Sequence, residues 1–154
     1  MRLNKKIALV TAAASGMGRA GVTRFAQEGA QVVAVDVDEK NLNTVVKGLT
    51  DAGFDAIGIC ADLTDDTECA RIVTDTVQHY GGLDLLWNHV GHPGYSRVED
   101  LDAADYEITM DLNLRSVFRT TGAAIPAMQS RGGGSILFTA SIAGLIGSPF
   151  SPVY

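Results

Sequence analysis

The sequence has 154 residues, 46% of them hydrophobic and 19% charged, with a formal net charge of −6. This length and apolar content fit a single folded domain and exclude an intrinsically disordered chain. The acidic balance argues against nucleic acid and anionic membranes as partners, because both need a basic surface. No apolar run reaches the ~18 residues of a membrane span, and no signal peptide precedes the first strand pattern. We therefore expect a cytoplasmic protein with no membrane partner.

Short apolar runs alternate with helical patterns through the first 60 residues. Strands are expected over 5–10, 31–36 and 55–60. A helix over 16–28 ends at Gly29, and a second helix ends near Gly53, because glycine is the common residue after a helix C-terminus. The apolar side of this second helix is formed by Leu42, Val45, Val46 and Leu49.

The remaining patterns continue the alternation. A helix is expected to start near Asp65, with Glu68 completing a capping box, and strands are expected over 83–88 and 135–139. Between these strands a long helix should begin at about residue 103, with Pro126 bending or interrupting its last turns. Its predicted inward stripe is Met110, Leu114, Val117, Phe118, Thr121, Ile125 and Met128.

Strands that alternate with helices require crossover connections, and hence a parallel sheet covered by helices on both faces. The predicted fold class is α/β, a doubly wound, Rossmann-type parallel sheet. We count five strands, whereas the dinucleotide-binding fold has two halves of three strands each. Residues 1–154 are therefore interpreted as one dinucleotide-binding domain that lacks its C-terminal strands and comes from a longer protein.

The turn between the first strand and the first helix is the clearest functional motif. It runs Thr-Ala-Ala-Ala-Ser-Gly-Met-Gly over 11–18. The N–H groups of a first helical turn have no internal partner and bind anions, and glycine leaves room for a pyrophosphate. The candidate cofactor-binding residues of this turn are Thr11, Ala13, Ser15, Gly16, Met17 and Gly18.

Asp36 ends the second strand pattern, twenty residues after Gly16. An acid at this place accepts hydrogen bonds from an adenosine ribose. Its charge would repel a 2′-phosphate, and Ser15 and Val37 supply no compensating charge. We therefore predict NAD as the cofactor, in preference to NADP.

Several motifs in order resemble those of the short-chain dehydrogenase/reductase family. The 11–18 turn is similar to the family's Thr-Gly-x-x-x-Gly-x-Gly motif, and Asn-His-Val-Gly over 88–91 is similar to its Asn-Asn-Ala-Gly motif. Asp62-Leu63 resembles the pair that contacts the adenine ring. The resemblance covers the whole chain and implies five further cofactor-binding residues: Asp62, Leu63, Asn88, Val90 and Gly91.

The resemblance also implies a catalytic set of Asn113, Ser141 and Tyr154, with Ser141 and Tyr154 at the family's usual separation of thirteen residues. The implied reaction is hydride transfer between a secondary alcohol or ketone and the nicotinamide. Tyr154 would be the general acid/base, Ser141 would hold the substrate oxygen, and Asn113 would support a proton relay. Family members dimerise through the helix equivalent to 103–128, so a homo-oligomer, dimer or tetramer, is implied.

Three residues depart from the family pattern. Ala12 replaces the first glycine; it is strained if its φ is positive, and otherwise only adds a methyl group near the pyrophosphate. His89 and Val90 replace Asn and Ala. The family's lysine, which lowers the tyrosine pKa from about 10, would follow Tyr154. Residues 1–154 alone are therefore expected to be inactive as an enzyme.

Other interpretations stay open. A non-catalytic NAD-binding or regulatory protein would need the turn and Asp36 and nothing after Ser141. A nucleotide-dependent methyltransferase also uses a glycine turn and an acid, but it gives no reason for the spacing of Ser141 and Tyr154. No Gly-x-Ser-x-Gly motif surrounds Ser141, which argues against a hydrolase. His89 and His92 have no third ligand nearby and are interpreted as polar lining of the cleft; no metal is predicted.

Overall fold

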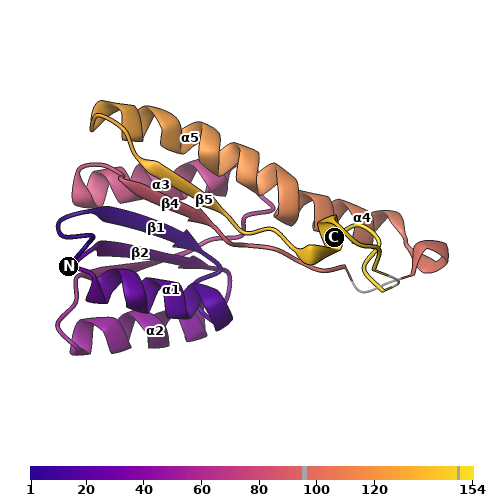
Figure 1. The fold of residues 1–154 in the computed structure, drawn as a ribbon, viewed down its shortest axis with the longest axis horizontal. Helices are drawn as coiled ribbons and strands as arrows, with labels where there is room; N and C mark the ends of the chain where they lie inside the picture. The colour runs from indigo at the N-terminus through magenta and orange to yellow at the C-terminus, as the bar shows by residue number, and fades with distance from the viewer. Residues whose placement is uncertain (95–96, 149) are drawn as a thin grey trace.

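The computed structural model describes residues 1–94, 97–148 and 150–154, and it confirms the α/β class. Five parallel strands form one sheet in the order β3-β2-β1-β4-β5 (Figure 1). The strand order reverses between β1 and β4, and open α/β sheets bind ligands at such a point. The strands are β1 (Ile7–Thr11), β2 (Gln31–Asp36), β3 (Ala56–Cys60), β4 (Leu85–Asn88) and β5 (Ser135–Phe138).

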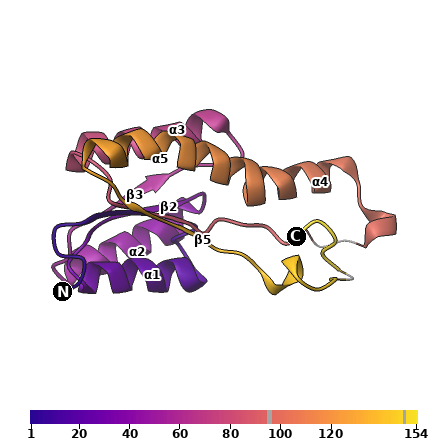
Figure 2. The ribbon, with the colours of Figure 1, turned by 45° about the horizontal axis from the view of Figure 1, so that its top comes forward.

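Helices cover both faces of the sheet, as Figure 2 shows. On one face lie α1 (Gly16–Gln27) and α2 (Glu39–Asp51), and on the other lie α3 (Asp66–Tyr80) and α5 (Ser116–Ser130). Strand residues alternate between two buried apolar clusters because successive side chains point to opposite faces. In β1, Ala8 and Val10 pack toward α1 and α2, and Leu9 packs toward α3 and α5.

The long helix predicted from residue 103 is divided in a different place from the one expected. It consists of α4 (Ala103–Met110), a π-helical turn η2 (Asp111–Arg115) and α5, which continues through Pro126 to Ser130. The predicted inward stripe was wrong for Leu114, Phe118 and Ile125, which are exposed. The buried face instead carries Ser116, Thr120, Ala124 and Met128.

Small polar residues can occupy this buried face because they bond within their own helix. The Ser116 hydroxyl donates to the Leu112 carbonyl at 2.7 Å, and the Thr120 hydroxyl donates to the Ser116 carbonyl at 2.8 Å. A buried hydroxyl that has such a partner avoids the cost of an unsatisfied polar group. Apolar periodicity alone therefore predicted the wrong buried face for α5.

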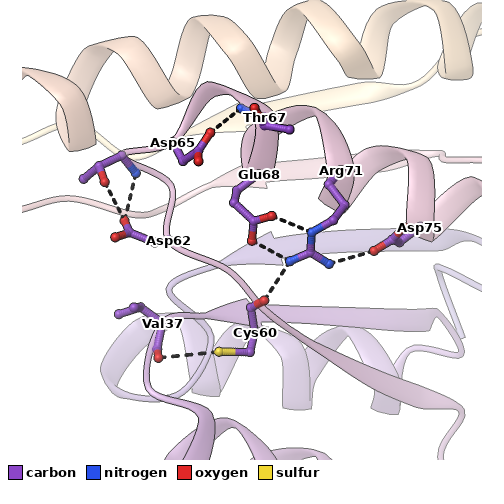
Figure 3. Close-up of polar contacts among 9 residues, drawn as sticks. Val37, Cys60, Asp62, Asp65, Thr67, Glu68, Arg71 and Asp75 are labelled. Carbon is purple, nitrogen blue, oxygen red and sulfur yellow. Dashed lines mark hydrogen bonds and ion pairs between the residues drawn. The ribbon is translucent and has the colours of Figure 1, made fainter.

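The start of α3 also differs from the expected capping box. The Asp65 carboxylate accepts from the Thr67 N–H at 2.6 Å, but Glu68 binds Arg71 through both of its oxygens (Figure 3). The same guanidinium donates to the Cys60 carbonyl at 2.8 Å. Arg71 therefore binds the Glu68 carboxylate that a capping box would direct to the N-cap backbone N–H. Through its bond to Cys60, Arg71 also joins α3 to the end of β3.

Asp84 joins three elements at the opposite, amino edge of the sheet. Its buried carboxylate accepts from the Ile7 N–H at 2.9 Å and from Arg131 at 3.1 and 3.2 Å, with Lys6 at 3.5 Å. Burial acts to raise the pKa of Asp84, but Arg131, the Ile7 N–H and Lys6 outweigh it and lower the pKa from its ordinary 3.8. The Asp84 carboxylate, just before β4, therefore holds the start of β1 and the end of α5 together.

Ala12 has a φ of +53°, which answers the question left open by the sequence. A residue with a Cβ is strained in this left-handed region. Gly18 is required for a different reason, because a Cβ there would lie 2.0 Å from the Ala12 carbonyl oxygen. Glycine at position 18 therefore lets α1 lie close to the Ala12 carbonyl, whereas the backbone at Ala12 itself is strained.

Asp84→Ala should lower the free energy of unfolding at pH 7 by about 3 kcal/mol, because it leaves Arg131 without its buried partner. The stabilisation by Asp84 is present above the unfolded-state pKa of 3.8 and is lost as the pH falls through the lower folded-state value. Urea unfolding between pH 7 and pH 3 should show the variant's deficit narrowing in acid. Asp51→Ala, which breaks an exposed 2.7 Å pair with Lys47, is the control and should cost about 0.5 kcal/mol or less. An equal loss of unfolding free energy in the two variants would contradict the stabilising role of Asp84.

Ala12→Gly should stabilise the protein by about 1 kcal/mol, because glycine adopts a positive φ without strain. Ala20→Gly is the matched control, the same chemical change at an exposed position inside α1, and should cost about 1 kcal/mol. Thermal unfolding of the two variants should therefore move the Tm in opposite directions. A fall in Tm for Ala12→Gly would show that the strain argument is wrong.

Candidate functional site

A cavity of about 480 Å³ opens at the carboxyl edge of the sheet, where the strand order reverses. Its volume lies in the range of small-molecule and cofactor sites. Eight of the predicted site residues line it: Ser15, Gly16, Met17, Val90, Gly91, Asn113, Ser141 and Tyr154. The lining is completed by Ala12, His89, Val117, Thr139, Ala140 and Gly144. Segments far apart in the chain therefore contribute to one site.

The N-terminus of α1 forms part of the cavity lining. Ser15 is the N-cap residue, and within the described chain its side chain makes no capping hydrogen bond. The first turn of α1 holds no acidic residue, so no side chain of this turn neutralises the positive end of the helix dipole. Gly16 and Met17 line the cavity at this end, where free N–H groups and the dipole favour a negatively charged group.

Thr11 and Ala13 lie behind the cavity and are not part of its lining. The buried Thr11 hydroxyl accepts from the His89 and Val90 N–H groups at 2.9 and 3.0 Å. The Ala13 N–H donates to the Val35 carbonyl at 2.9 Å. In this structure both residues hold the loops that form the site.

Asp36 stands beside the turn at the end of β2. Its carboxylate accepts from the Ala14 N–H at 2.9 Å and from the Asp38 N–H at 3.0 Å. A carboxylate has about four lone-pair sites, so two of them remain for further donors. Asp36 therefore shapes the turn and keeps the capacity to accept from ribose hydroxyls.

Asp62 and Leu63 follow β3, outside the cavity lining. One Asp62 oxygen accepts from the N–H and the hydroxyl of Thr64 at 3.0 and 2.8 Å (Figure 3). Asp62 is exposed, whereas the Leu63 side chain is 5% exposed and belongs to the apolar core. Arg71, bound to the Cys60 carbonyl, holds the strand end that precedes this pair.

Asn88 is 2% exposed and lies beneath the cavity. Its side-chain oxygen lies 2.7 Å from the Thr120 hydroxyl, whose one proton it shares with the Ser116 carbonyl, and its amide donates to the Thr121 hydroxyl at 3.1 Å. Its main-chain carbonyl accepts from the Thr139 N–H at 3.0 Å. Asn88 therefore joins β4 to α5 and to the residue that follows β5.

Asn113 lies in the π-helical turn η2 and binds the backbone of the loop after β4. Its side chain accepts from the His92 N–H and donates to the His92 carbonyl, both at 2.7 Å. A Cβ on Gly91 would lie 2.9 Å from the Asn113 side-chain oxygen, so any larger residue there would displace the Asn113 side chain. π-helical turns inside helices are common at functional sites, and this one carries a side chain that lines the cavity.

Ser141 and Tyr154 both line the cavity. Ser141 follows β5 by three residues, and its hydroxyl accepts from the Ala143 N–H at 3.2 Å. The Tyr154 ring lies within 3.9 Å of the position of a Cβ on Gly91, and the residue is 41% exposed. The cavity lining therefore includes two hydroxyl-bearing side chains that come after β5 in the chain.

Two contacts in the site were not predicted from the sequence. The Thr139 hydroxyl accepts from the Trp87 indole N–H at 2.9 Å and lies 2.9 Å from Nδ1 of His89. His89 lines the cavity as interpreted, and burial lowers the pKa of its ring. The only sequence signal for Thr139 was its place directly after a strand at the carboxyl edge.

Comparison with known proteins agrees with this arrangement. The chain is 34% identical to the 3-oxoacyl-(acyl-carrier-protein) reductase of Thermotoga maritima over 149 residues, which are 97% of this chain and 61% of that protein. It matches the crystal structure of NAD+-bound xylitol dehydrogenase with a TM-score of 0.94 at 28% identity, covering 100% of this chain and 60% of the other. The match to a short-chain dehydrogenase/reductase from Burkholderia phymatum in complex with NAD has a TM-score of 0.95 at 28% identity, covering 100% and 55%.

The chain thus spans less than two thirds of the length of each of these relatives. Within that span the family pattern is continuous. The model of the family described as short chain dehydrogenase matches residues 6–154, from the first strand to Tyr154. The chain belongs to the short-chain dehydrogenase/reductase family.

Proposed function

We propose that the protein is an NAD-dependent oxidoreductase of the short-chain type, which transfers hydride between a secondary alcohol or ketone and nicotinamide. The observation that carries the proposal is one cavity lined by the N-terminus of α1, Asn113, Ser141 and Tyr154. The family and two NAD-bound structural neighbours support it. Hydride acceptance or donation would be supplied by the nicotinamide ring of the bound cofactor.

The residues present fit a dinucleotide. The turn at 12–18 leaves no room for a side chain at Gly18, and the α1 N-terminus offers N–H donors to a pyrophosphate. Asp36 keeps lone pairs for the adenosine ribose and places a negative charge where NADP carries a phosphate. On these grounds NAD is the preferred cofactor, with Asp62 and Leu63 beside the adenine.

The proposed catalytic roles come from the family resemblance and are supported by the presence of Asn113, Ser141 and Tyr154 in the cavity lining. Tyr154 would exchange the proton of the substrate hydroxyl, and Ser141 would hold the same oxygen by a hydrogen bond. Asn113 would support a proton relay while it holds the backbone at His92. A phenol has a pKa of about 10 and needs a nearby positive charge to act as a base at neutral pH. The family resemblance assigns that charge to a lysine beyond Tyr154.

The 154 residues are proposed to be part of a longer cytoplasmic enzyme. β5 is an edge strand whose Leu137 and Phe138 are 53% and 55% exposed, so further strands and a helix would cover them. Phe118 is 70% exposed on α5, near the exposed Leu114 and Ile125. We propose that this face meets a second copy in a homo-oligomer. Among the described residues, no helix is long and apolar enough to cross a membrane.

A non-catalytic NAD-binding or regulatory protein is the second candidate. It would use Asp36 and the 11–18 turn in the same way. It gives no account of why Ser141 and Tyr154 line the same cavity as that turn. The two candidates differ in the role of the Tyr154 phenol, which transfers a proton in the first and has no chemical role in the second.

Tyr154→Phe in the intact protein should lower kcat/KM by at least about 100-fold, because it removes the proton-transferring hydroxyl. The Kd for NADH should stay unchanged. Turnover is measured as NADH absorbance with NAD and a panel of secondary alcohols. Tyr106→Phe, at an exposed position on α4, is the control. Undiminished turnover in Tyr154→Phe would contradict the proposed role of Tyr154, whereas wild-type protein that binds NADH but turns over none of the alcohols would favour the non-catalytic candidate.

Asp36→Asn should move the ratio of the Kd values for NADH and NADPH by about 10-fold or more toward NADPH, because the repelling charge is removed. Both values are obtained by titration of Trp87 fluorescence. Asp38→Asn is the matched control: Asp38 caps α2 through the Asn41 N–H at 3.0 Å, and asparagine is an equally good cap. Wild-type protein that binds NADPH as tightly as NADH would contradict the assigned preference.

A further inference from the structure

We propose that Arg71 is a positioning residue for the adenosine half of the cofactor. It fixes the peptide unit between Cys60 and Ala61, which joins β3 to the loop that carries Asp62. The inference deepens the proposed function and rests on it. Arg71 lies on α3 and is not part of the cavity lining, so its effect on a ligand would pass through the backbone.

The first step is the orientation of the guanidinium group, which two acids on the same helix hold (Figure 3). Nε and Nη2 of Arg71 donate to the two oxygens of Glu68 at 2.7 and 2.6 Å, and Nη1 donates to Asp75 at 2.8 Å. The hydrogen bonds from Arg71 lower the pKa of Glu68 from its ordinary 4.5, so this carboxylate is ionised at pH 7. A planar guanidinium that is bound through all three nitrogens keeps one orientation.

The second step concerns the peptide unit between Cys60 and Ala61. Its N–H donates to the main-chain carbonyl of Asp36 at 3.1 Å, and its carbonyl accepts from Nη2 of Arg71 at 2.8 Å. The C=O and N–H of a planar trans peptide point in opposite directions. β3 is an edge strand with β2 on one side, so Arg71 holds this unit from the side that has no strand partner. The unit is therefore bonded to β2 and to α3 at once.

The side chain of Cys60 restrains the end of β3 much less. Its thiol lies 3.7 Å from the Val37 carbonyl (Figure 3), and a thiol is a weak donor. A hydrogen bond from a charged guanidinium is roughly twice as strong as one between neutral groups. The position of the strand end therefore depends on Arg71 more than on the Cys60 side chain.

The third step connects this peptide unit to the adenosine end of the proposed site. Asp36, whose main chain is bonded to the unit, also binds the Ala14 N–H through its carboxylate and is the proposed acceptor for the ribose. Asp62 directly follows the unit, and its carboxylate accepts from the N–H and hydroxyl of Thr64. A displaced peptide unit would thus move Asp62 relative to Asp36. Holding the unit in place before binding lowers the entropy that the ligand must remove.

The test measures the Kd values of AMP and NADH for the intact protein by isothermal titration calorimetry, together with the KM for NAD and kcat. Arg71→Met should raise both Kd values and the KM for NAD by about 5-fold or more, because the adenosine wall is no longer held before binding. The kcat at saturating NAD should stay unchanged, because the nicotinamide end is untouched. Arg24→Met is the matched control: it breaks an ion pair with Glu28 in the last turn of α1 and should bind both ligands like the wild type.

Two further measurements separate positioning from charge and from loss of folding. Arg71→Lys keeps the charge, but an ammonium has no planar fork that binds Glu68 and Cys60 together, so AMP should weaken nearly as much as in Arg71→Met. Hydrogen exchange of the Ala61 amide should be faster in both Arg71 variants and unchanged in Arg24→Met. All assays are run well below the Tm of each variant, and Arg71→Lys decides the test if Arg71→Met does not fold.

The outcomes separate this inference from the function it rests on. If the wild type binds neither AMP nor NADH, the proposed function itself fails. If the wild type binds both and Arg71→Met binds AMP equally well, the inference is wrong and the function stands. Wild-type AMP affinity in Arg71→Lys would assign the effect to charge alone and overturn the inference. A fall in kcat at saturating NAD as large as the rise in KM would indicate a general loss of structure and overturn it as well.

Discussion

Two buried polar side chains, Thr11 and Asn88, hold the carboxyl edge of the sheet on which the whole site is built. Thr11 ends β1 and binds the backbone of the loop after β4, and Asn88 ends β4 and binds two threonines of α5. Buried donors and acceptors must be paired, so these side chains allow only a narrow range of loop positions. The strand order reverses between these two strands, and the loops that Thr11 and Asn88 hold are the ones that line the cavity.

The same constraint explains how the two sides of the site are related. α1 begins directly after β1 and presents its N-terminus to a ligand, while α5 is bonded to β4 through Asn88. The π-helical turn before α5 brings Asn113 onto the backbone at His92, so the two sides of the cavity share one framework. The strained Ala12 lies within this framework, where the surrounding hydrogen bonds maintain an unfavourable φ.

Sequence reasoning located the strands well, because fully buried parallel strands are continuous apolar runs bounded by glycine and polar residues. β2 was predicted with its exact bounds, Gln31–Asp36, and the other strands to within two residues at either end. It failed on the inward face of α5, because Ser116 and Thr120 bond within the helix and can be buried, while Phe118 is left outside. It also failed on the role of Glu68, because Arg71 competes for the carboxylate through a fold-dependent contact with β3.

The sequence by itself determined the order of strands and helices, the glycine-containing turn after β1, the acid at Asp36 and the identity of the hydroxyl-bearing residues near the end. These depend on periodicity and on neighbours along the chain. Only the tertiary structure decided which of these residues share a cavity, that Thr11 and Asn88 support the site from behind, and that Thr139 meets His89 across fifty residues. The physical reason is that such contacts depend on the register and packing of β1, β4 and β5, which local sequence patterns do not specify.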